Sequence, residues 1–454
     1  MVGAILRSFR LMRQATVSRS DPLVSNFLSS FFRTLTIDAP SLRGRSIGPL
    51  DSILRALGAW MSSRISYMGT KHDLANRVAQ VIANCRPGRL LDAFAGMGAV
   101  AEAQAGKRQV WTNDVQHFAY LASRCRFTDP NGPLPVDQMR KFAKPIYREN
   151  MALLREQNQK GWRAATKLPA ASTFHEFARL FSVISDEAIS HQNAYGCFIG
   201  TYANSYFSLP QCAEIDSLRC AIDTLRGHGV LRPEEFDWAL LALGHAVLRV
   251  ANTTGHFAQF LRPSAKNFRR IARQFRRSVF EQWLVSLGSL HPSGTAKWRK
   301  ANLASRSDCD SLIRTVGKSS DVGVVYCDPP YTADQYSRFY HIWETLVLYD
   351  YPTVTGQGLY RPGRFTTDFS LRSKVEVAFG TLIAEIASTG ADLVLSYPSN
   401  GLLHEVGGSP LDLLRAQYPK ARLIDQIAHS HSTMGASKGQ ATAPVAECLY
   451  EAKA

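Results

Sequence analysis

The stretch RLLDAFAGMGAV, residues 89–100, decides the fold class of this 454-residue chain. It is typical of a short apolar strand, a glycine turn and the start of a helix, with Asp92 at the end of the strand. Gly96 and Gly98 fall in the turn, where glycines let a ligand approach the backbone closely. A lone GxG turn is often only a tight connection, so the rest of the chain has to decide its meaning.

The continuation strengthens the nucleotide-binding interpretation. A helix of small residues, Val100 to Ala105, is followed by RQVWTNDVQ, residues 108–116, which we interpret as a second strand. Asp114 stands at the end of that strand. In nucleotide-binding α/β units an acidic side chain at this place accepts hydrogen bonds from ribose hydroxyls. Asp114 is therefore a candidate ribose ligand.

A second motif, VVYCDPPY, lies at residues 324–331. It predicts a strand that ends at Asp328, followed by Pro329 and Pro330, which deny the backbone its donors and forbid an immediate helix. The Asp328 carboxylate and the Pro329 carbonyl could both accept hydrogen bonds from the amino group of a flat ring, and Tyr331 offers a face for stacking. The alternative is a strand with a proline-rich turn, and this motif alone leaves both interpretations open.

Together these motifs carry a family resemblance. FAGMG, Asn113-Asp114, VVYCDPPY and the upstream SYMGTK of residues 66–71 resemble the S-adenosylmethionine-dependent DNA adenine-N6 methyltransferases of the Dam-like (D12) class. The resemblance covers residues 61–128 and 302–454. It implies S-adenosyl-L-methionine as cofactor and the catalytic residues Asp328, Pro329, Pro330 and Tyr331. It also implies a cofactor site built from Tyr67, Gly69, Lys71, Asp92, Phe94, Gly96, Gly98, Asp114 and Asp308.

The resemblance implies an activity: methyl transfer to N6 of an adenine in a specific duplex DNA site, with the base flipped out of the helix. Restriction-modification is one biological setting that this class suggests, a phage or a housekeeping role stays open beside it, and the enzyme would act as a monomer. Two alternatives stay open. The protein could methylate another planar amine, in RNA guanine or at cytosine N4, or it could be a catalytically inactive DNA-binding relative.

Composition agrees with a nucleic-acid partner. Lysine and arginine number 53 against 37 aspartate and glutamate residues, which gives a net charge of +16. Such a balance favours a polyanion through phosphate contacts and counterion release. No apolar run reaches membrane-spanning length, so we expect a soluble protein of the cytoplasm, associated with the nucleoid of a prokaryotic host.

The sequence offers no clear metal site. Its eight cysteines are scattered, without a CxxC pair or a cysteine-histidine cluster at zinc spacing, and we expect reduced thiols. His429 and His431 form a pair without an acidic or cysteine partner nearby. We interpret that pair as part of a polar loop.

The alternation of elements predicts an α/β fold, a doubly wound, mostly parallel Rossmann-like sheet with a helical, basic inserted domain. Downstream of DPPY we expect a helix at 377–388, a buried strand at 391–400, a helix near 410–417 and a final strand at 443–452. The predicted domains are a leader, the first methyltransferase part, the insertion and the second methyltransferase part, at residues 1–60, 61–128, 129–300 and 301–454.

The leader differs from the rest in composition. It is rich in arginine and serine, contains no lysine, and shows no core pattern. A mitochondrial presequence has this composition. The other interpretation, which we favour, is that the natural start lies at or near Met61 and that the leader is not part of the core.

The insertion contains a strongly basic stretch. From Asn267 we expect one helix with an apolar face made by Phe268, Ile271, Phe275, Val279 and Trp283. Beside and opposite that face lie Arg269, Arg270, Arg273, Arg276 and Arg277. A charge run is often only a solvated face, but this one has no acid before Glu281, and we expect it to contact DNA phosphates.

Several other residues are candidates for the pocket. Tyr336 and Phe339, after DPPY, could hold a flipped base. Asp308 or Asp310 could meet the cofactor's adenine at the end of a strand at 300–306, or could simply cap a helix that begins at Ser311. Aromatic residues before the helix that starts at Leu209 could enter the duplex, but packing in the core is the preferred interpretation for Tyr202, Tyr206 and Phe207.

Overall fold

A computed structural model describes residues 74–185, 195–317, 321–432 and 442–454. All of them belong to one compact unit of the chain. The leader at residues 1–60 lies outside the described residues. So do Tyr67, Gly69 and Lys71 of the SYMGTK stretch.

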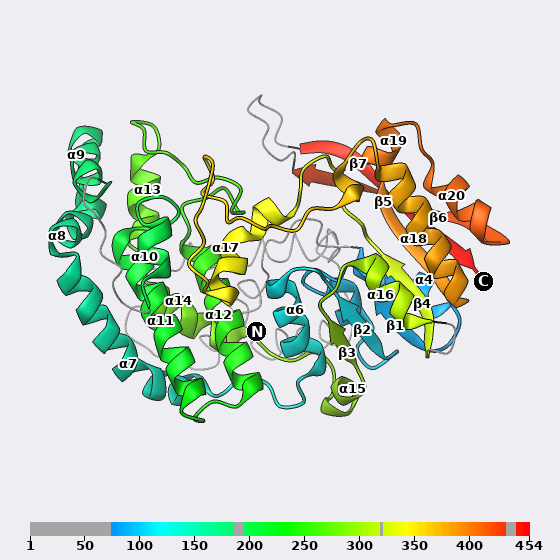
Figure 1. Cartoon of the computed structure of the whole chain (residues 1–454), viewed down its shortest axis with the longest axis horizontal. Coiled ribbons are helices and arrows are strands. Elements are labelled where there is room, and N and C mark those ends of the chain that lie inside the picture. The colour runs from blue at the N-terminus through cyan, green and yellow to red at the C-terminus, as the bar shows by residue number, and fades with distance from the viewer. Residues whose placement is uncertain (1–73, 186–194, 318–320, 433–441) are drawn as a thin grey trace, which may run out of the picture. The chain divides into compact units, whose positions relative to one another are not determined.

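A seven-stranded sheet forms the centre of the α/β part, in the order β3-β2-β1-β4-β5-β7-β6 (Figure 1). Five neighbouring strands are parallel, and β7 runs antiparallel to both β5 and β6. The strands are β1 Arg89–Asp92, β2 Val110–Asn113, β3 Leu303–Ser305, β4 Val322–Cys327, β5 Asp392–Pro398, β6 Lys420–Ser432 and β7 Thr442–Lys453. The predicted mostly parallel sheet is confirmed.

Helices cover both faces of this sheet, which explains why β4 is fully buried and why β1 has apolar residues facing both sides. In β1, Leu90 packs with the helices of one face and Leu91 with those of the other; Val324 and Val325 of β4 alternate in the same way. The first face carries α4 Ala75–Ala83, α5 Ala99–Ala103 and α15 Ala296–Lys300. The second face carries α16 Cys309–Val316, α18 Val375–Thr389, α19 Leu402–Glu405 and α20 Pro410–Gln417.

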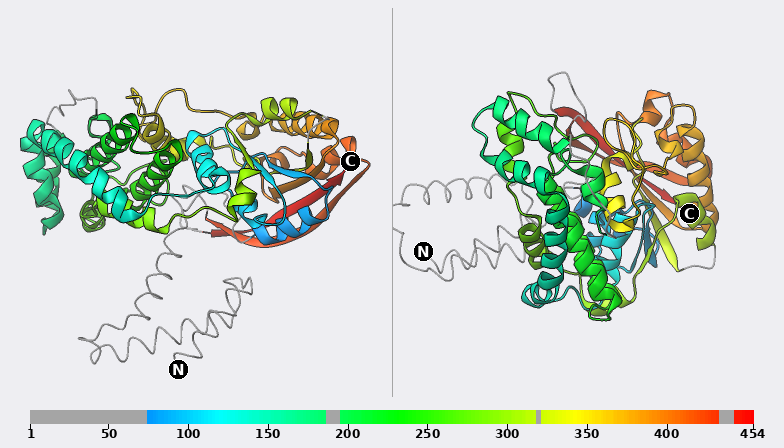
Figure 2. Two further views of the ribbon diagram at one scale, coloured as in Figure 1. Left: turned by 90° about the horizontal axis from the view of Figure 1, so that it is seen from below. Right: turned by 60° about the vertical axis from the view of Figure 1, so that its left-hand side comes forward.

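The chain between β2 and β3 is helical, as predicted for the insertion (Figure 2). Its elements are α6 His117–Ser123, η1 Arg124–Thr128, α7 Val136–Gln157, α8 Gln159–Lys167, η2 Leu168–Ala170, α9 Phe174–Ser185, α10 Cys197–Tyr202, α11 Leu209–Gly227, α12 Pro233–Val250, α13 Phe268–Phe275 and α14 Val279–Ser289. A large hydrophobic core joins these helices.

One helix from beyond the insertion shares this core. α17 Ser337–Leu348 follows DPPY, yet its residues Tyr340, Ile342 and Trp343 pack in the same cluster as α11, α12 and α14. A short turn, η3 Asp368–Ser370, then leads the chain back toward the sheet and α18. The predicted domain boundaries stay predictions, but the packing shows that α17 binds the insertion and the sheet together.

Two local predictions are wrong. The basic stretch does not form one helix, because α13 ends at Phe275 and α14 starts at Val279. Ser278 has an extended backbone there, and its hydroxyl accepts a hydrogen bond from the Glu281 amide, so it caps a new helix. His429 and His431 lie in strand β6, paired with β7, and not in a loop.

The packing interpretation of the aromatic stretch is confirmed. Tyr202, Tyr206 and Phe207 have no exposed surface, and the Tyr206 hydroxyl donates to the Phe257 and Gly358 carbonyls. In the following helix α11, the apolar residues that recur at helical spacing are buried, namely Cys212, Ile215, Leu218 and Ile222. These side chains therefore build the helical core and do not reach the surface.

Candidate active site

A pocket lies at the carboxyl ends of the parallel strands, where β1 is flanked by β2 on one side and β4 on the other. At such a point the connections leave in opposite directions, and a crevice opens between them. Residues that end or follow four strands line it: Asp92 after β1, Asp114 after β2, Asp308 after β3 and Asp328 after β4. The fold thus brings together motifs that are up to 236 residues apart in the chain.

Asp92 is the most deeply buried of these carboxylates, with 1% of its surface exposed. One of its carboxyl oxygens, Oδ1, has no hydrogen-bond partner in the described part of the chain. Burial first, and then the negative charges of Asp328 and Asp114, raise the pKa of Asp92 to about 8. Burial therefore favours the neutral form of the Asp92 carboxyl, and a positive charge placed beside it would lower its pKa again.

Asp114 is tied to the glycine turn. Its Oδ2 accepts the Gly96 amide at 3.0 Å and its Oδ1 accepts the Gln116 amide at 2.9 Å. Burial raises the pKa of Asp114 to about 6, although these amide bonds oppose the shift. Both oxygens keep further lone pairs, so the carboxylate can still accept hydroxyl donors from a ligand.

The glycine turn needs its glycines for two reasons. Gly96 and Gly98 have φ angles of 50° and 72°, in the left-handed region that favours glycine. A Cβ on Gly98 would also meet the ring of Phe127 at 2.2 Å. The predicted turn into a helix is confirmed by the start of α5, and Gly96 lines the pocket, whereas Gly98 does not line it and packs against Phe127.

Charge decides which ligands the pocket accepts. Five aspartates line it, Asp92, Asp114, Asp308, Asp310 and Asp328, and none of its described lining residues is a lysine or arginine. A pocket of this kind repels phosphates and attracts cations and amino groups. The chain as a whole is strongly basic, so the acidity is a local feature of this site.

Asp308 caps a helix, which was one of its two expected roles, and its contact with the cofactor's adenine stays a prediction. Its carboxylate accepts the Ser311 amide at 2.9 Å and so caps α16. It also lines the pocket, next to Cys309 and Asp310. The cap holds this carboxylate at the pocket wall.

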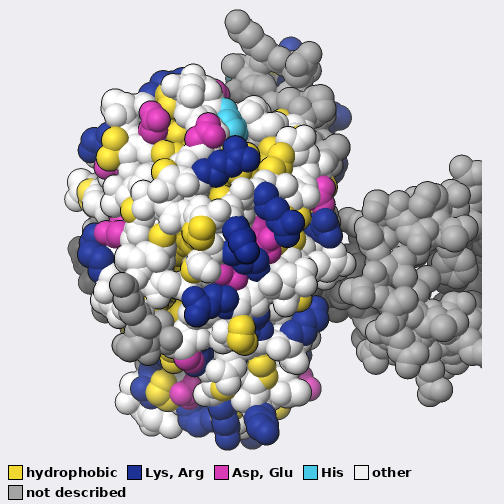
Figure 3. All heavy atoms as spheres, turned by 90° about the vertical axis from the view of Figure 1, so that its right-hand side faces the viewer, with side chains coloured by type: hydrophobic (Ala, Val, Ile, Leu, Met, Phe, Trp, Pro, Cys, Tyr) yellow, Lys and Arg dark blue, Asp and Glu magenta, His cyan; other side chains and the backbone are white. Residues whose placement is uncertain are grey.

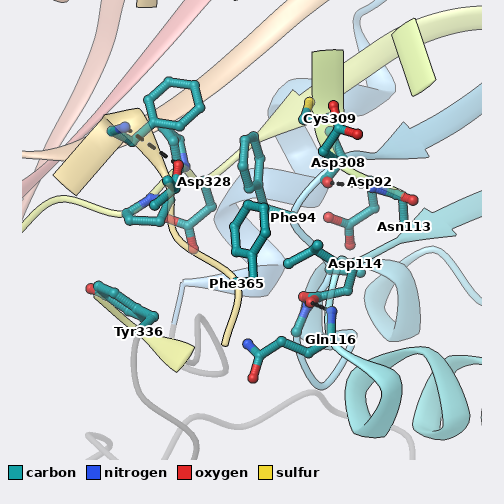
Figure 4. A pocket seen from close by; sticks show the side chains of 18 of the residues that line it. Asp92, Phe94, Asn113, Asp114, Gln116, Asp308, Cys309, Asp328, Tyr336 and Phe365 are labelled. Carbon is teal, nitrogen blue, oxygen red and sulfur yellow. Dashed lines mark hydrogen bonds between the residues drawn. The ribbon is translucent and has the colours of Figure 1, made fainter. Parts of the chain in front are cut away.

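The DPPY residues form the opposite side of the pocket. Asp328, Pro329, Pro330 and Tyr331 all line it. The ring of Tyr331 meets that of Tyr336 edge to face, with centroids 6.0 Å apart. In Figure 4, Asp328 and Tyr336 lie on one side and Asp114 and Gln116 on the other, with the rings of Phe94 and Phe365 between them. The site therefore has a DPPY half and a half next to Asp114.

The expectation for Phe339 is corrected. Only 1% of this side chain is exposed, and it packs in the helical core. The reason is that α17 begins at Ser337, so the first helical turn directs Phe339 toward the core and leaves Tyr336 at the pocket. Phe339 therefore cannot contact a base without unfolding the start of α17.

The predicted arginines lie away from the pocket lining. Arg269, Arg270, Arg273, Arg276 and Arg277 are all exposed. Three of them donate to backbone carbonyls: Arg270 to Thr253, Arg276 to Pro169 and Arg277 to Arg249. Within the described part of the chain these arginines form no ion pair with an acid.

Sequence reasoning missed one wall of the pocket. Phe365, Thr367 and Phe369 line it, although they lie more than 30 residues after DPPY. The Gln335 side chain holds this segment: its Nε2 donates to the Thr367 carbonyl at 3.1 Å, and its Oε1 accepts the Thr367 amide at 2.8 Å. No motif marks these residues, and only the folded chain brings them to the site.

Comparison with known proteins defines the class. Residues 296–386 match the family model of the D12 class N6 adenine-specific DNA methyltransferases. This match spans β3, β4, DPPY, α17 and most of α18, and it confirms the class that the motifs predicted.

Individual relatives agree with this class. The chain is 24% identical over 350 residues to modification methylase LlaI of Lactococcus lactis subsp. lactis, across 77% of this chain and 47% of that protein. It is 26% identical over 349 residues to the type II methyltransferase M.FokI of Planomicrobium okeanokoites, across 75% and 45%. It is 24% identical over 349 residues to the type II methyltransferase M.NlaIII of Neisseria lactamica, across 75% and 85%. The chain thus spans about half the length of the first two.

Proposed function

We propose that the protein transfers the methyl group of S-adenosyl-L-methionine to N6 of adenine in duplex DNA. The observation that carries this proposal is an acidic pocket at the switch point of the sheet, with the DPPY residues forming one of its sides. Such a pocket suits a cationic methyl donor and an amine-bearing base, and the class of the chain specifies adenine N6.

The residues present fit this cofactor. When bound, it supplies an electrophilic methyl group on a positively charged sulfur. Asp114 would accept hydrogen bonds from the ribose hydroxyls. Asp92, whose buried Oδ1 has no partner among the described residues, would accept a hydrogen bond from the amino group of the methionine end. Asp308 would face the adenine, and Phe94, Gly96 and Gly98 would shape the cleft between them. Tyr67, Gly69 and Lys71 remain candidates for the methionine end.

The DPPY half would hold the target base. Asp328 and the Pro329 carbonyl would accept hydrogen bonds from the two N–H groups of the adenine amino group. These bonds would turn the nitrogen lone pair toward the methyl carbon. Tyr331 and Tyr336 would bound the ring of the base. As the new C–N bond forms, the bond between the methyl carbon and the sulfonium sulfur breaks and leaves a neutral thioether. The amino group becomes acidic at the same time, and its proton passes to a carboxylate or to water.

Duplex DNA is the proposed substrate, and a monomer the proposed active form. The helical insertion would contact the DNA backbone through the exposed arginines of α13. Among the described residues, Arg269 and Arg273 donate no hydrogen bond to a protein carbonyl. Lysine and arginine side chains are also spread over the face that carries α18 and α20 (Figure 3). The overall charge would therefore attract DNA, and the insertion would position it. Protection of DNA within a restriction-modification system is the role that the relatives' names suggest.

The decisive experiment supplies methyl-labelled S-adenosylmethionine and unmethylated duplex DNA, then identifies the labelled nucleoside by mass spectrometry. We expect N6-methyladenine from the wild type and none from Asp328→Ala, which should still bind the cofactor in calorimetry. Asp412→Ala, an exposed acid on α20, is the matched control and should keep full activity.

Other outcomes separate the alternatives. Label in cytosine would show that the target base is cytosine and not adenine. Label only in RNA would show that the substrate is RNA and not duplex DNA. A wild-type protein that binds DNA but no S-adenosylmethionine would be an inactive DNA-binding relative. Retained transfer in Asp328→Ala would refute the assignment of Asp328.

A further inference from the structure

The half of the pocket next to Asp114 depends on a short connection between β2 and α6. Asp114 and Gln116 line the pocket from this connection. The Asp114 carboxylate accepts the Gln116 amide, and Gln116 is the residue from which α6 starts. The position of Asp114, which we propose to bind the ribose, is therefore linked to the N-terminus of α6.

α6 lacks a cap of its own. The Gln116 side chain makes no capping hydrogen bond, and the first turn contains no acidic residue. The amides of His117 and Phe118 instead donate to the two carboxylate oxygens of Glu344, at 3.1 and 3.0 Å. Glu344 lies 226 residues after Phe118, so the tertiary structure supplies this cap.

Glu344 belongs to the DPPY side of the site. It lies on α17, which begins directly after the loop that carries Tyr331 and Tyr336. Burial raises the pKa of Glu344, its bonds to the two amides oppose this shift, and the charge of nearby Asp114 adds to it. One buried carboxylate thus connects the helix after the base-binding loop with the segment that carries Asp114.

The surrounding packing makes this connection rigid. The Trp343 ring stacks on Phe118, with centroids 4.3 Å apart, and its Nε1 donates to the Gly244 carbonyl at 2.9 Å. Gly244 lets α12 approach α6 closely, since a Cβ there would meet the Phe118 ring at 2.2 Å. α6, α12 and α17 therefore meet in a close-packed junction with Glu344 at its pocket end.

We propose that Glu344 is a positioning residue, which holds residues 114–118 at the geometry that cofactor binding requires and fixes them relative to the base-binding loop. This inference rests on the proposed function, because the ligand of Asp114 is taken to be S-adenosylmethionine. Glu344 does not line the pocket and touches neither ligand, so it acts through Gln116 and Asp114.

The chain offers a matched control. Glu214, on α11, caps α14 from a distance in the same way: its carboxylate accepts the Phe280 amide at 2.7 Å and the Ser278 hydroxyl at 2.9 Å. Burial raises the pKa of Glu214 as well, and the residue does not line the pocket. Glu344→Gln and Glu214→Gln therefore remove the same kind of interaction, and only the first should affect the cofactor.

The experiment compares the wild type, Glu344→Gln, Glu344→Ala and Glu214→Gln as full-length proteins. Three quantities are measured: the Kd for S-adenosylmethionine by calorimetry, amide hydrogen exchange of residues 115–118, and urea stability. We expect Glu344→Gln to raise the Kd roughly tenfold and Glu344→Ala to raise it more. Exchange at 115–118 should rise in both. Glu214→Gln should lose stability with an unchanged Kd and unchanged exchange at 115–118.

Two results would overturn the inference: a Kd in Glu344→Gln equal to that of the wild type, or an equal rise of the Kd in Glu214→Gln, which would be a global effect. The proposed function is tested separately, by measuring the binding of S-adenosylmethionine to the wild type. If the wild type bound no S-adenosylmethionine, that function would fall, together with the role of Glu344 in cofactor binding.

Discussion

Asp92 combines three properties that seldom occur together: a carboxyl group, nearly complete burial and an oxygen with no hydrogen-bond partner among the residues that the structure describes. Its pKa rises from 3.8 to about 8. Between these values the folded protein keeps a proton that the unfolded chain has lost. The free energy of unfolding must therefore fall as the pH rises through this range, by up to about 1.4 kcal/mol per pH unit.

Asparagine at this position cannot titrate. We expect Asp92→Asn to gain stability relative to the wild type as the pH rises from 5 to 8, as measured by urea denaturation at both values. If the difference in unfolding free energy between the two proteins did not change with pH, Asp92 would not hold the proton.

Gly98 allows a test of the glycine turn. Gly98→Ala places a side chain at a φ of 72° and into the Phe127 ring. Gly106→Ala is the control, because Gly106 has a φ of 75° with no atom within 4 Å of the added Cβ. The backbone strain of about 1–2 kcal/mol should be common to both variants. Gly98→Ala should lose about 1–3 kcal/mol more in urea denaturation through overpacking. Equal losses would show that the close approach to Phe127 relaxes freely.

At the scale of elements, the segment 365–369 depends on the Gln335 side chain. Gln335→Ala removes both hydrogen bonds to Thr367, while the hydrogen bond from Ser370 Oγ to the Asp334 carbonyl remains. We expect faster hydrogen exchange at 365–369 and a roughly tenfold lower kcat/KM for methyl transfer, since a loosened wall misplaces the base. Gln357→Ala, which removes an exposed side chain in a loop, is the control and should change neither quantity. Unchanged exchange would show that packing of Phe369 alone holds this wall.

Helix α13 carries the proposed phosphate contacts. The double variant Arg269→Ala/Arg273→Ala should weaken DNA binding. It should also make the plot of the logarithm of the binding constant against the logarithm of salt concentration less steep, by about 0.9 per lost phosphate contact. Anisotropy titrations at several salt concentrations measure this slope. Arg415→Ala, an exposed arginine on α20, should leave the slope unchanged, because in the proposal that face attracts DNA without contacting its phosphates. A slope unaffected by the α13 variant would place the DNA contacts elsewhere.

At the scale of the whole molecule, the α6–α12–α17 junction joins the sheet to the helical insertion. Gly244→Ala would drive a Cβ into the Phe118 ring, and we expect a loss of about 1–3 kcal/mol in one cooperative urea transition. Gly227→Ala, at the open end of α11, should be neutral or slightly stabilising, because alanine is the better helix former. Two separate transitions in the Gly244 variant would mean that the two parts unfold independently.

The sequence by itself determined the parallel strands of the sheet, the glycine turn and the turn after the DPPY strand, because each of these depends on residues that are neighbours in the chain. RLLD and VVYC are apolar enough to be buried on both faces, and glycine and proline fix the turns that follow. The same local logic predicted that Asp92, Asp114, Asp308 and Asp328 would each end or follow a strand, and the folded sheet brings all four to one pocket.

Only the tertiary structure decided the rest, because it depends on contacts between distant segments. The wall at 365–369 reaches the pocket through a side-chain clamp, and Phe339 turns into the core since the start of α17 fixes its direction. The cap of α6 comes from Glu344, 226 residues further along the chain than Phe118. Periodicity and motifs carry no information on such pairings, which the packing of whole elements selects.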